Sequence, residues 1–146
     1  YADSSAAARY SDAPDYFEKA TAAIEQMFRQ TGPYEIDSSG ILRKGVLIRH
    51  LILPGQVENT KKVLEYVAGT FAPGEVLFSL MRQYVPCGRA AEYPEINRPI
   101  TDEEYEECES YMEELGIVDG YVQQKASSDK TFIPAFDGTG VLKREE

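Results

Sequence analysis

Apolar residues recur at steps of three and four over residues 14–29, which predicts an amphipathic helix. Ser11 or Asp12 can cap the start of this helix, and Gly32 can end it. Its apolar positions are Phe17, Ala20, Ile24, Met27 and Phe28. A small hairpin or a structured loop is expected next, over residues 34–44, where Ser-Ser-Gly separates two short patterned stretches.

The next patterned segment is an apolar run from Val46 to Leu53, interrupted only by Arg49 and His50. Its length, its branched residues and the glycines and proline beside it predict a buried strand of the parallel-sheet type. Successive side chains of a strand point to opposite faces. One face therefore carries Leu47, Arg49, Leu51 and Leu53, and the other carries Val46, Ile48, His50 and Ile52.

Helix and strand patterns alternate through the rest of the chain. A helix over 59–69 and a strand over 76–81 follow the first strand. A capping box, in which Thr101 and Glu104 satisfy each other's backbone donors, opens another helix. This helix is expected to bury Tyr105, Cys108, Met112 and Leu115. A short strand is predicted over 121–124.

The order of these elements predicts an α/β fold, with right-handed βα units on a parallel sheet, in one domain over residues 1–146. A complete (β/α) barrel needs about 250 residues, so these units would form part of a TIM-like barrel. The irregular stretch 82–99 is too long for a casual connection between elements, which indicates a function or a partner for it.

The chain has 146 residues and a formal net charge of −10 at pH 7, from 25 acidic and 15 basic residues. Nucleic-acid binding is not expected because it needs a basic surface, and an anionic membrane would repel the chain. No apolar run approaches the roughly 20 residues of a membrane span, and no charged-then-apolar leader is expected before the first helix. We therefore expect a soluble, cytoplasmic protein. Because it starts at Tyr1, we also expect it to begin partway through a larger one.

Two cysteines and one histidine limit the possible metal chemistry. Cys87 and Cys108 alone make neither a disulfide framework nor a cysteine-only metal site, and a histidine-rich metal centre is excluded. Cys108 lies at a core position of its helix and is predicted to be an apolar filler, whereas Cys87 is expected to be exposed. His50 shares its strand face with branched aliphatic residues, which favours a hydrogen-bonded core histidine over a catalytic base.

Arg49 is the clearest candidate for chemistry, because an unpaired buried guanidinium is costly. It should meet a carboxylate, a carbonyl or a ligand anion, and a salt bridge within the chain explains it as well as a ligand does. The face of the 76–81 strand that carries Ser79 and Met81 is too polar to pack on helices, so it would face a ligand-containing lumen. Ligands of parallel α/β sheets bind at the carboxyl ends of the strands. The candidate site residues are Arg49, Leu51, Met81, Gln83 and Tyr84.

Five segments occur in an order that is typical of one family. They are YSDAPDYF (10–17), RHLILPG (49–55), SLMRQYVP (79–86), YPEINRPIT (93–101) and FIPAFD (132–137). Together they resemble the C-terminal half of radical S-adenosylmethionine proteins of the kind that are similar to the pyruvate formate-lyase-activating enzyme.

The resemblance implies a partial (β/α) barrel, S-adenosylmethionine and a four-iron four-sulfur cluster held by a Cys-x3-Cys-x2-Cys loop. It implies reductive cleavage of S-adenosylmethionine to a 5′-deoxyadenosyl radical that abstracts hydrogen from the substrate. In the activating enzymes that substrate is a glycine of a partner, a glycyl-radical enzyme. A flavodoxin or ferredoxin would serve as the electron donor. The cofactor carries the hard chemistry, and the protein supplies position, electrostatics and exclusion of water.

The resemblance also assigns roles to single residues. Arg49 matches a strand arginine that contacts S-adenosylmethionine, and Leu51 matches the residue that packs against it. Met81, Gln83 and Tyr84 fall where the next strand borders the cofactor. The 82–99 stretch would lie over the barrel mouth, where a peptide partner could approach.

The cluster motif itself is absent, and Cys87 and Cys108 cannot replace it. The missing part is expected to lie before Tyr1, which would leave a sheet edge exposed and open to dimerisation. An alternative is a stand-alone acidic α/β domain that binds a small anion or a peptide at its strand ends through Arg49. A third interpretation is purely structural, with Arg49 and Gln83 satisfying each other and nearby carbonyls.

Overall fold

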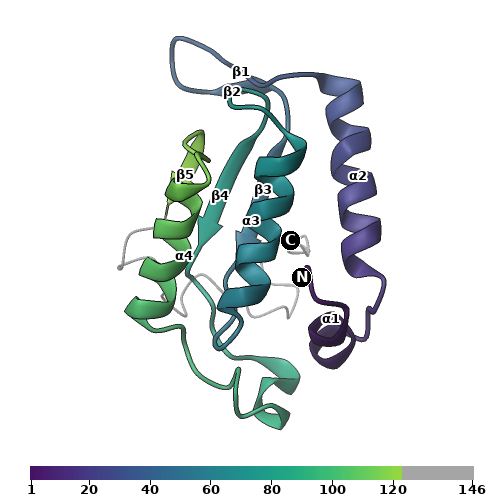
Figure 1. Cartoon of the computed structure of the whole chain (residues 1–146), viewed down its shortest axis with the longest axis vertical. Helices are drawn as coiled ribbons and strands as arrows, with labels where there is room; N and C mark the ends of the chain where they lie inside the picture. The colour runs from purple at the N-terminus through teal and green to yellow at the C-terminus, as the bar shows by residue number, and fades with distance from the viewer. Residues whose placement is uncertain (123–146) are drawn as a thin grey trace, which may run out of the picture.

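The computed structural model describes residues 1–122. In this part of the chain, helices alternate with strands from the first strand of the main sheet onward (Figure 1). The helices are α1 (Ser4–Ser11), α2 (Tyr16–Thr31), α3 (Val57–Thr70), the 3-10 helix η1 (Gly88–Glu92) and α4 (Asp102–Glu114). The strands are β1 (Glu35–Ile36), β2 (Leu42–Lys44), β3 (Leu47–Leu51), β4 (Leu77–Met81) and β5 (Gly120–Val122).

The main sheet has the order β3-β4-β5 and is parallel throughout. Arg49 is the register partner of Ser79, and Leu51 is the partner of Met81. The crossovers run through α3 and α4, which confirms the predicted mixed α/β fold with a parallel sheet. Gly120 begins β5 so close to β4 that a Cβ atom there would clash with the carbonyl oxygen of Phe78, so this position requires glycine.

The core lies between this sheet and the helices α3 and α4, which cover the same face of it (Figure 1). Ile48 and Ile52 at β3, with Phe78 and Leu80 of β4, supply the sheet side of the core. The helices contribute Val63, Leu64 and Val67 from α3, and Tyr105, Cys108 and Met112 from α4. The period of 3.6 in the helices and of 2 in the strands thus put most of the expected residues inside. Leu115, also expected to be buried, follows the end of α4 and is only partly buried.

The predicted buried strand of the parallel-sheet type is parallel, as expected, but β3 is buried on only one face. Its residues alternate between exposed and buried, with Leu47 38% and Leu51 36% exposed and Arg49 exposed as well. Within the described residues β3 is an edge strand, and α3 and α4 cover only its other face. By contrast, β4 lies between two strands and is buried at every position.

The start of the chain also differs from the prediction. Residues 4–11 form α1, whose N-terminus is capped by the Asp3 side chain, and Ala6 and Ala7 are buried. Ser11 and Asp12 therefore do not cap the predicted helix. Asp12 instead ends α1 with a φ of 56°, and α2 begins after Asp15 without a side-chain cap. Burial of the small alanine residues stabilises α1, although the amphipathic pattern there is too short to predict a helix.

The other predicted elements are confirmed. The 34–44 segment forms the antiparallel β1–β2 hairpin, and the capping box at the start of α4 is present, with 2.9 and 3.2 Å between its donors and acceptors. α2 runs beside α3, where Phe28 and Phe71 stack edge to face at 5.2 Å. The segment 132–137 and the end of the predicted 121–124 strand lie outside the described residues. No helix within residues 1–122 is long and apolar enough to cross a membrane.

Candidate functional site

The strand residues of the candidate site, Arg49, Leu51 and Met81, lie on the face of the main sheet opposite α3 and α4, whereas Tyr84, after β4, packs against the core. We call the face opposite α3 and α4 the Arg49 face, and it is formed by Leu47, Arg49, Leu51, Leu77, Ser79 and Met81. The register of β3 and β4 sets Arg49 beside Ser79. The next pair on the same face, nearer the carboxyl ends of the strands, is Leu51 beside Met81. The predicted helix-packed face of the two strands is confirmed. On the other face the β3 residues are exposed, whereas Leu77, Ser79 and Met81 of β4 are buried.

Arg49 lines a hollow of about 260 Å³, here called the Arg49 hollow, with Leu51 and Leu53 from the end of β3. His50 lines it as well, and Tyr1, Tyr16 of α2 and Asn59 of α3 complete it, so this hollow borders the helix side of β3 and not the Arg49 face alone. No carboxylate within residues 1–122 forms an ion pair with Arg49, although the chain carries 25 acidic residues. The expected salt bridge to an acidic residue is therefore not found in this part of the chain.

His50 points away from the Arg49 face and into the core. Its Nε2 atom lies 3.0 Å from the Thr60 hydroxyl of α3, and its ring stacks on Phe78. Burial lowers the pKa of His50 from 6.5 to about 4, so the imidazole is neutral near pH 7. The prediction of a hydrogen-bonded core histidine is confirmed.

Tyr84 lines a second hollow, of about 180 Å³, which shares Tyr1 and Leu53 with the first. We call it the tyrosine hollow, because Tyr1, Tyr10, Tyr84 and Tyr93 all line it. The Tyr84 hydroxyl donates to the carbonyl oxygen of Ile96 at 3.0 Å, and burial raises its pKa.

The five predicted site residues are thus brought to one end of the sheet but not into one hollow. Arg49 and Leu51 line the Arg49 hollow, and Tyr84 lines the tyrosine hollow. Met81 is buried at the end of β4, only 9% exposed. Gln83 is half-buried in the segment that follows.

Ion pairs that the sequence analysis did not identify hold the 82–99 segment in place. Arg82, at its start, donates to Asp102 at 2.8 Å and stacks over the ring of Tyr105, with its Cζ atom 4.7 Å from the ring centroid. Arg9 of α1 pairs with Glu95 in the middle of the segment, also at 2.8 Å. These partners lie 20 and 86 positions apart in the chain. No local pattern reveals such pairs.

Glu104 forms the densest polar junction near the site. Its carboxylate accepts from both terminal nitrogens of Arg98, at 2.8 and 2.7 Å. It also accepts from the backbone N–H of Thr101 at 2.9 Å and of Gly55 at 2.7 Å. The hydrogen bonds from Arg98, opposed by partial burial, hold the pKa of Glu104 at about 2. The sequence revealed only the Thr101 contact, as part of the capping box.

The two cysteines lie as predicted. Cys108 is fully buried in the core, and burial raises the pKa of its thiol to about 11, whereas Cys87 is exposed. Within residues 1–122 no group of three or more histidine, cysteine or acidic side chains could hold a metal ion. The described part of the chain therefore does not fit an iron–sulfur cluster.

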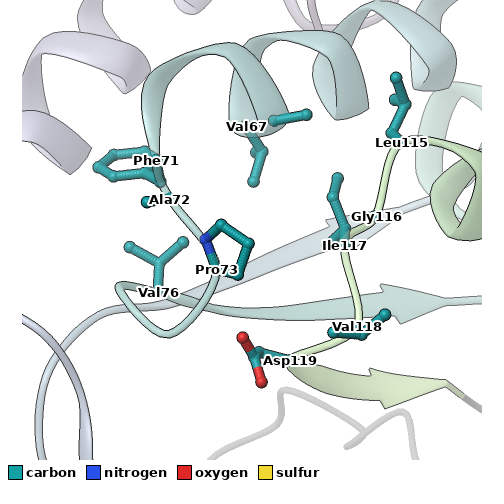
Figure 2. Close-up of a pocket in the computed structure, with 11 residues that line it drawn as sticks. Val67, Phe71, Ala72, Pro73, Val76, Leu115, Gly116, Ile117, Val118 and Asp119 are labelled. Carbon is teal, nitrogen blue, oxygen red and sulfur yellow. The ribbon is translucent and has the colours of Figure 1, made fainter.

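A further hollow, of about 60 Å³, lies at the opposite end of the sheet (Figure 2). Apolar side chains from the end of α3 and from residues 115–118 line it, and Asp119 lies at its rim. The Asp119 carboxylate is already engaged, since it accepts from the Tyr34 hydroxyl at 3.0 Å and from the Gly74 N–H at 2.7 Å. This hollow is much smaller than the usual small-molecule site.

Comparison with known proteins gives one informative match. A stretch of 73 residues, 49% of the chain, is 33% identical to an uncharacterized protein of Methanocaldococcus jannaschii. This stretch is 21% of that protein, so the chain spans about a fifth of the length of the curated relative it matches. No protein-family profile and no solved structure matches the chain.

Proposed function

We propose that this chain is the C-terminal portion of a radical S-adenosylmethionine enzyme similar to the pyruvate formate-lyase-activating enzyme, and that it supplies part of the cofactor site. The observation that carries the proposal is Arg49, a cation without a carboxylate partner among residues 1–122. It lies on the strand face opposite the helix-packed core and lines a hollow that α2 and α3 also border. Arg49 is also the residue that the RHLILPG segment matches to the family's cofactor-binding arginine.

The topology supports this proposal. Doubly wound sheets reverse their strand order and carry helices on both faces, whereas a barrel adds strands in chain order and carries helices outside. Here β3, β4 and β5 are neighbours in chain order, and both crossover helices cover one face. The Arg49 face would then be the lumen of a partial barrel.

The residues of the Arg49 face fit S-adenosylmethionine. Its carboxylate suits the Arg49 guanidinium, which can donate two parallel hydrogen bonds, and Leu51 beside Met81 offers apolar contact at the carboxyl ends of the strands. When bound to a reduced cluster, S-adenosylmethionine supplies a 5′-deoxyadenosyl radical that abstracts hydrogen. The residues described here would bind S-adenosylmethionine, orient it and exclude water from it.

Because the described residues do not fit the cluster, we place its cysteine ligands before Tyr1, in a Cys-x3-Cys-x2-Cys loop. The gene sequence upstream of Tyr1 tests this point directly. A three-cysteine loop in the same reading frame supports the proposal, and a start codon close to Tyr1 contradicts it. The proposed setting is the cytoplasm, with a glycyl-radical enzyme as substrate and a flavodoxin or ferredoxin as electron donor.

Arg49→Met in the complete protein tests the cofactor site. A hydrogen bond to a charged group contributes about 1.5–3 kcal/mol, so loss of the guanidinium should weaken S-adenosylmethionine binding by about 10- to 100-fold. Titration calorimetry measures the dissociation constant. Arg43→Met is the matched control, because Arg43 lies on the β1–β2 hairpin and pairs there with Asp37. Equal affinity of the Arg49→Met variant and the parent would contradict the proposal.

A second function is favoured by the exposure of Arg49 and by the size of the Arg49 hollow. In this alternative, the chain is a stand-alone domain that binds a small anion or a peptide through Arg49. The 146-residue chain would then bind an anion such as inorganic phosphate by itself, and Arg49→Met would abolish that binding. The first proposal instead expects S-adenosylmethionine to require the residues before Tyr1.

A further inference from the structure

The Arg49 hollow and the tyrosine hollow share part of their lining at the carboxyl end of the sheet. The turn after β3 carries Leu53, which lines both the Arg49 hollow and the tyrosine hollow. The opposite wall of the tyrosine hollow comes from the 82–99 segment, through Tyr84 and Ile96. The relative position of the turn and the segment therefore sets the width of the opening between them.

Glu104 contacts both walls. One carboxylate oxygen, Oε1, accepts from the Gly55 N–H, in the turn that begins at Leu53, at 2.7 Å. The same oxygen accepts from Arg98, at the end of the 82–99 segment, at 2.7 Å. The other oxygen, Oε2, accepts a second hydrogen bond from Arg98 and one from the Thr101 N–H. With two donors on each oxygen, the carboxylate is fixed in position and orientation.

The turn itself is suited to being fixed in this way. Gly55 has a φ of 70°, a left-handed conformation that favours glycine, and Pro54 beside it is fully buried. Gly55 is exposed, so its N–H would otherwise bond to water, and Glu104 converts a solvated turn into one that is tied to α4. The 82–99 segment is tied to the same helix at its other end through Arg82 and Asp102.

We propose that Glu104 is a positioning residue that holds the 53–55 turn and the 82–99 segment at a fixed spacing, and thereby controls the affinity of the site at the carboxyl ends of β3 and β4. The effect on S-adenosylmethionine rests on the proposed function above. The fixed spacing of the 53–55 turn and the 82–99 segment does not depend on that function.

The test compares Glu104→Gln with Thr101→Ala in the complete protein. Glutamine keeps one acceptor oxygen, but its amide nitrogen cannot accept, so two of the four hydrogen bonds are lost and the other two are no longer made to a charged group. Thr101→Ala removes the side-chain cap from the same helix and destabilises it, yet it leaves the Gly55 and Arg98 contacts in place. Both variants are measured at a temperature where thermal melts show them fully folded.

Glu104→Gln should weaken S-adenosylmethionine binding about tenfold, and Thr101→Ala should change it less than twofold. Hydrogen exchange should become at least tenfold faster at the Gly55 amide and in residues 93–98 of the Glu104→Gln variant only. An equal loss of affinity in both variants would mean that binding follows helix stability, and it would overturn the proposal. Unchanged exchange at Gly55 would overturn it as well.

These outcomes separate the two proposals. If the parent protein does not bind S-adenosylmethionine, the proposed function fails, and hydrogen exchange alone then decides whether Glu104 ties the two walls. If the parent binds and Arg49→Met does not, while Glu104→Gln binds like the parent, the function stands and the positioning role is rejected.

Discussion

At the scale of single residues, the negative charge of Glu104 determines how much this side chain contributes to the stability of the fold. Its pKa of about 2 in the folded chain lies below its ordinary value of 4.5, because the folded state provides hydrogen bonds to the carboxylate and the unfolded state does not. A depressed pKa adds stability that is fully present above the unfolded pKa and disappears as the pH falls through the folded pKa. The contribution of Glu104 is therefore lost between about pH 4.5 and pH 2.

We predict that Glu104→Gln lowers the free energy of unfolding at pH 6 by about 1–3 kcal/mol, the usual cost of removing hydrogen bonds to a charged group. This difference from the parent should shrink steadily as the pH falls from 5 to 2, because the parent loses the same interaction by protonation. Urea unfolding at a series of pH values measures the difference in the free energy of unfolding between the variant and the parent. Glu106→Gln, at an exposed position of α4, is the control and should follow the parent at every pH. A pH-independent difference would show that charge is not the cause.

At the scale of elements, β3 and α3 are tied by one buried polar contact. His50 lies on the core face of β3, and the Thr60 hydroxyl of α3, itself fully buried, is its partner. The contact joins the core face of β3 to α3, and alternation along the strand puts Arg49 on the opposite face. A single buried hydrogen bond of this kind specifies alignment more than it adds stability.

Thr60→Val should lower the free energy of unfolding by about 1–3 kcal/mol, because it leaves a buried histidine nitrogen without its partner while preserving side-chain shape. The midpoint of urea unfolding should fall with the slope unchanged. Thr21→Val is the matched control, because the Thr21 hydroxyl only bonds to carbonyl oxygens of its own helix. The control should change the stability by less than about 0.5 kcal/mol. A similar effect in both variants would rule out a special role for the His50 contact.

At the scale of the whole molecule, the main sheet has an edge at β3 within the described residues. Leu47 and Leu51 are exposed on either side of Arg49 there. An exposed apolar edge strand is a template for pairing with another chain, and natural proteins often protect such edges with charge.

We predict that the 146-residue chain forms dimers through β3 at high concentration. Leu47→Lys should shift the chain toward the monomer, and light scattering over a hundredfold concentration range measures the mass. Val118→Lys is the control, because Val118 is 76% exposed but lies beside β5 instead of β3. A parent chain that stays monomeric at all concentrations would contradict the prediction, and so would an equal effect of both lysines.

The elements were predictable because their signals are local. The capping box at Thr101, the apolar periods of α2 and α3, and the alternation in β3 all depend on residues a few positions apart. The alternation also placed Arg49 and His50 on opposite faces, and the face shared by His50 and three branched residues correctly indicated a core histidine.

The sequence by itself thus determined the order of the elements from α2 onward, the parallel sheet and most of the side chains that enter the core. Only the tertiary structure decided that β3 is covered on one face, and that Gly55, Arg98 and Glu104 meet. The physical reason is distance along the chain. Periodicity and capping act within one helix or strand, whereas the cover of a strand and the partners of a charge depend on segments that fold back from far away, such as the 49 positions between Gly55 and Glu104.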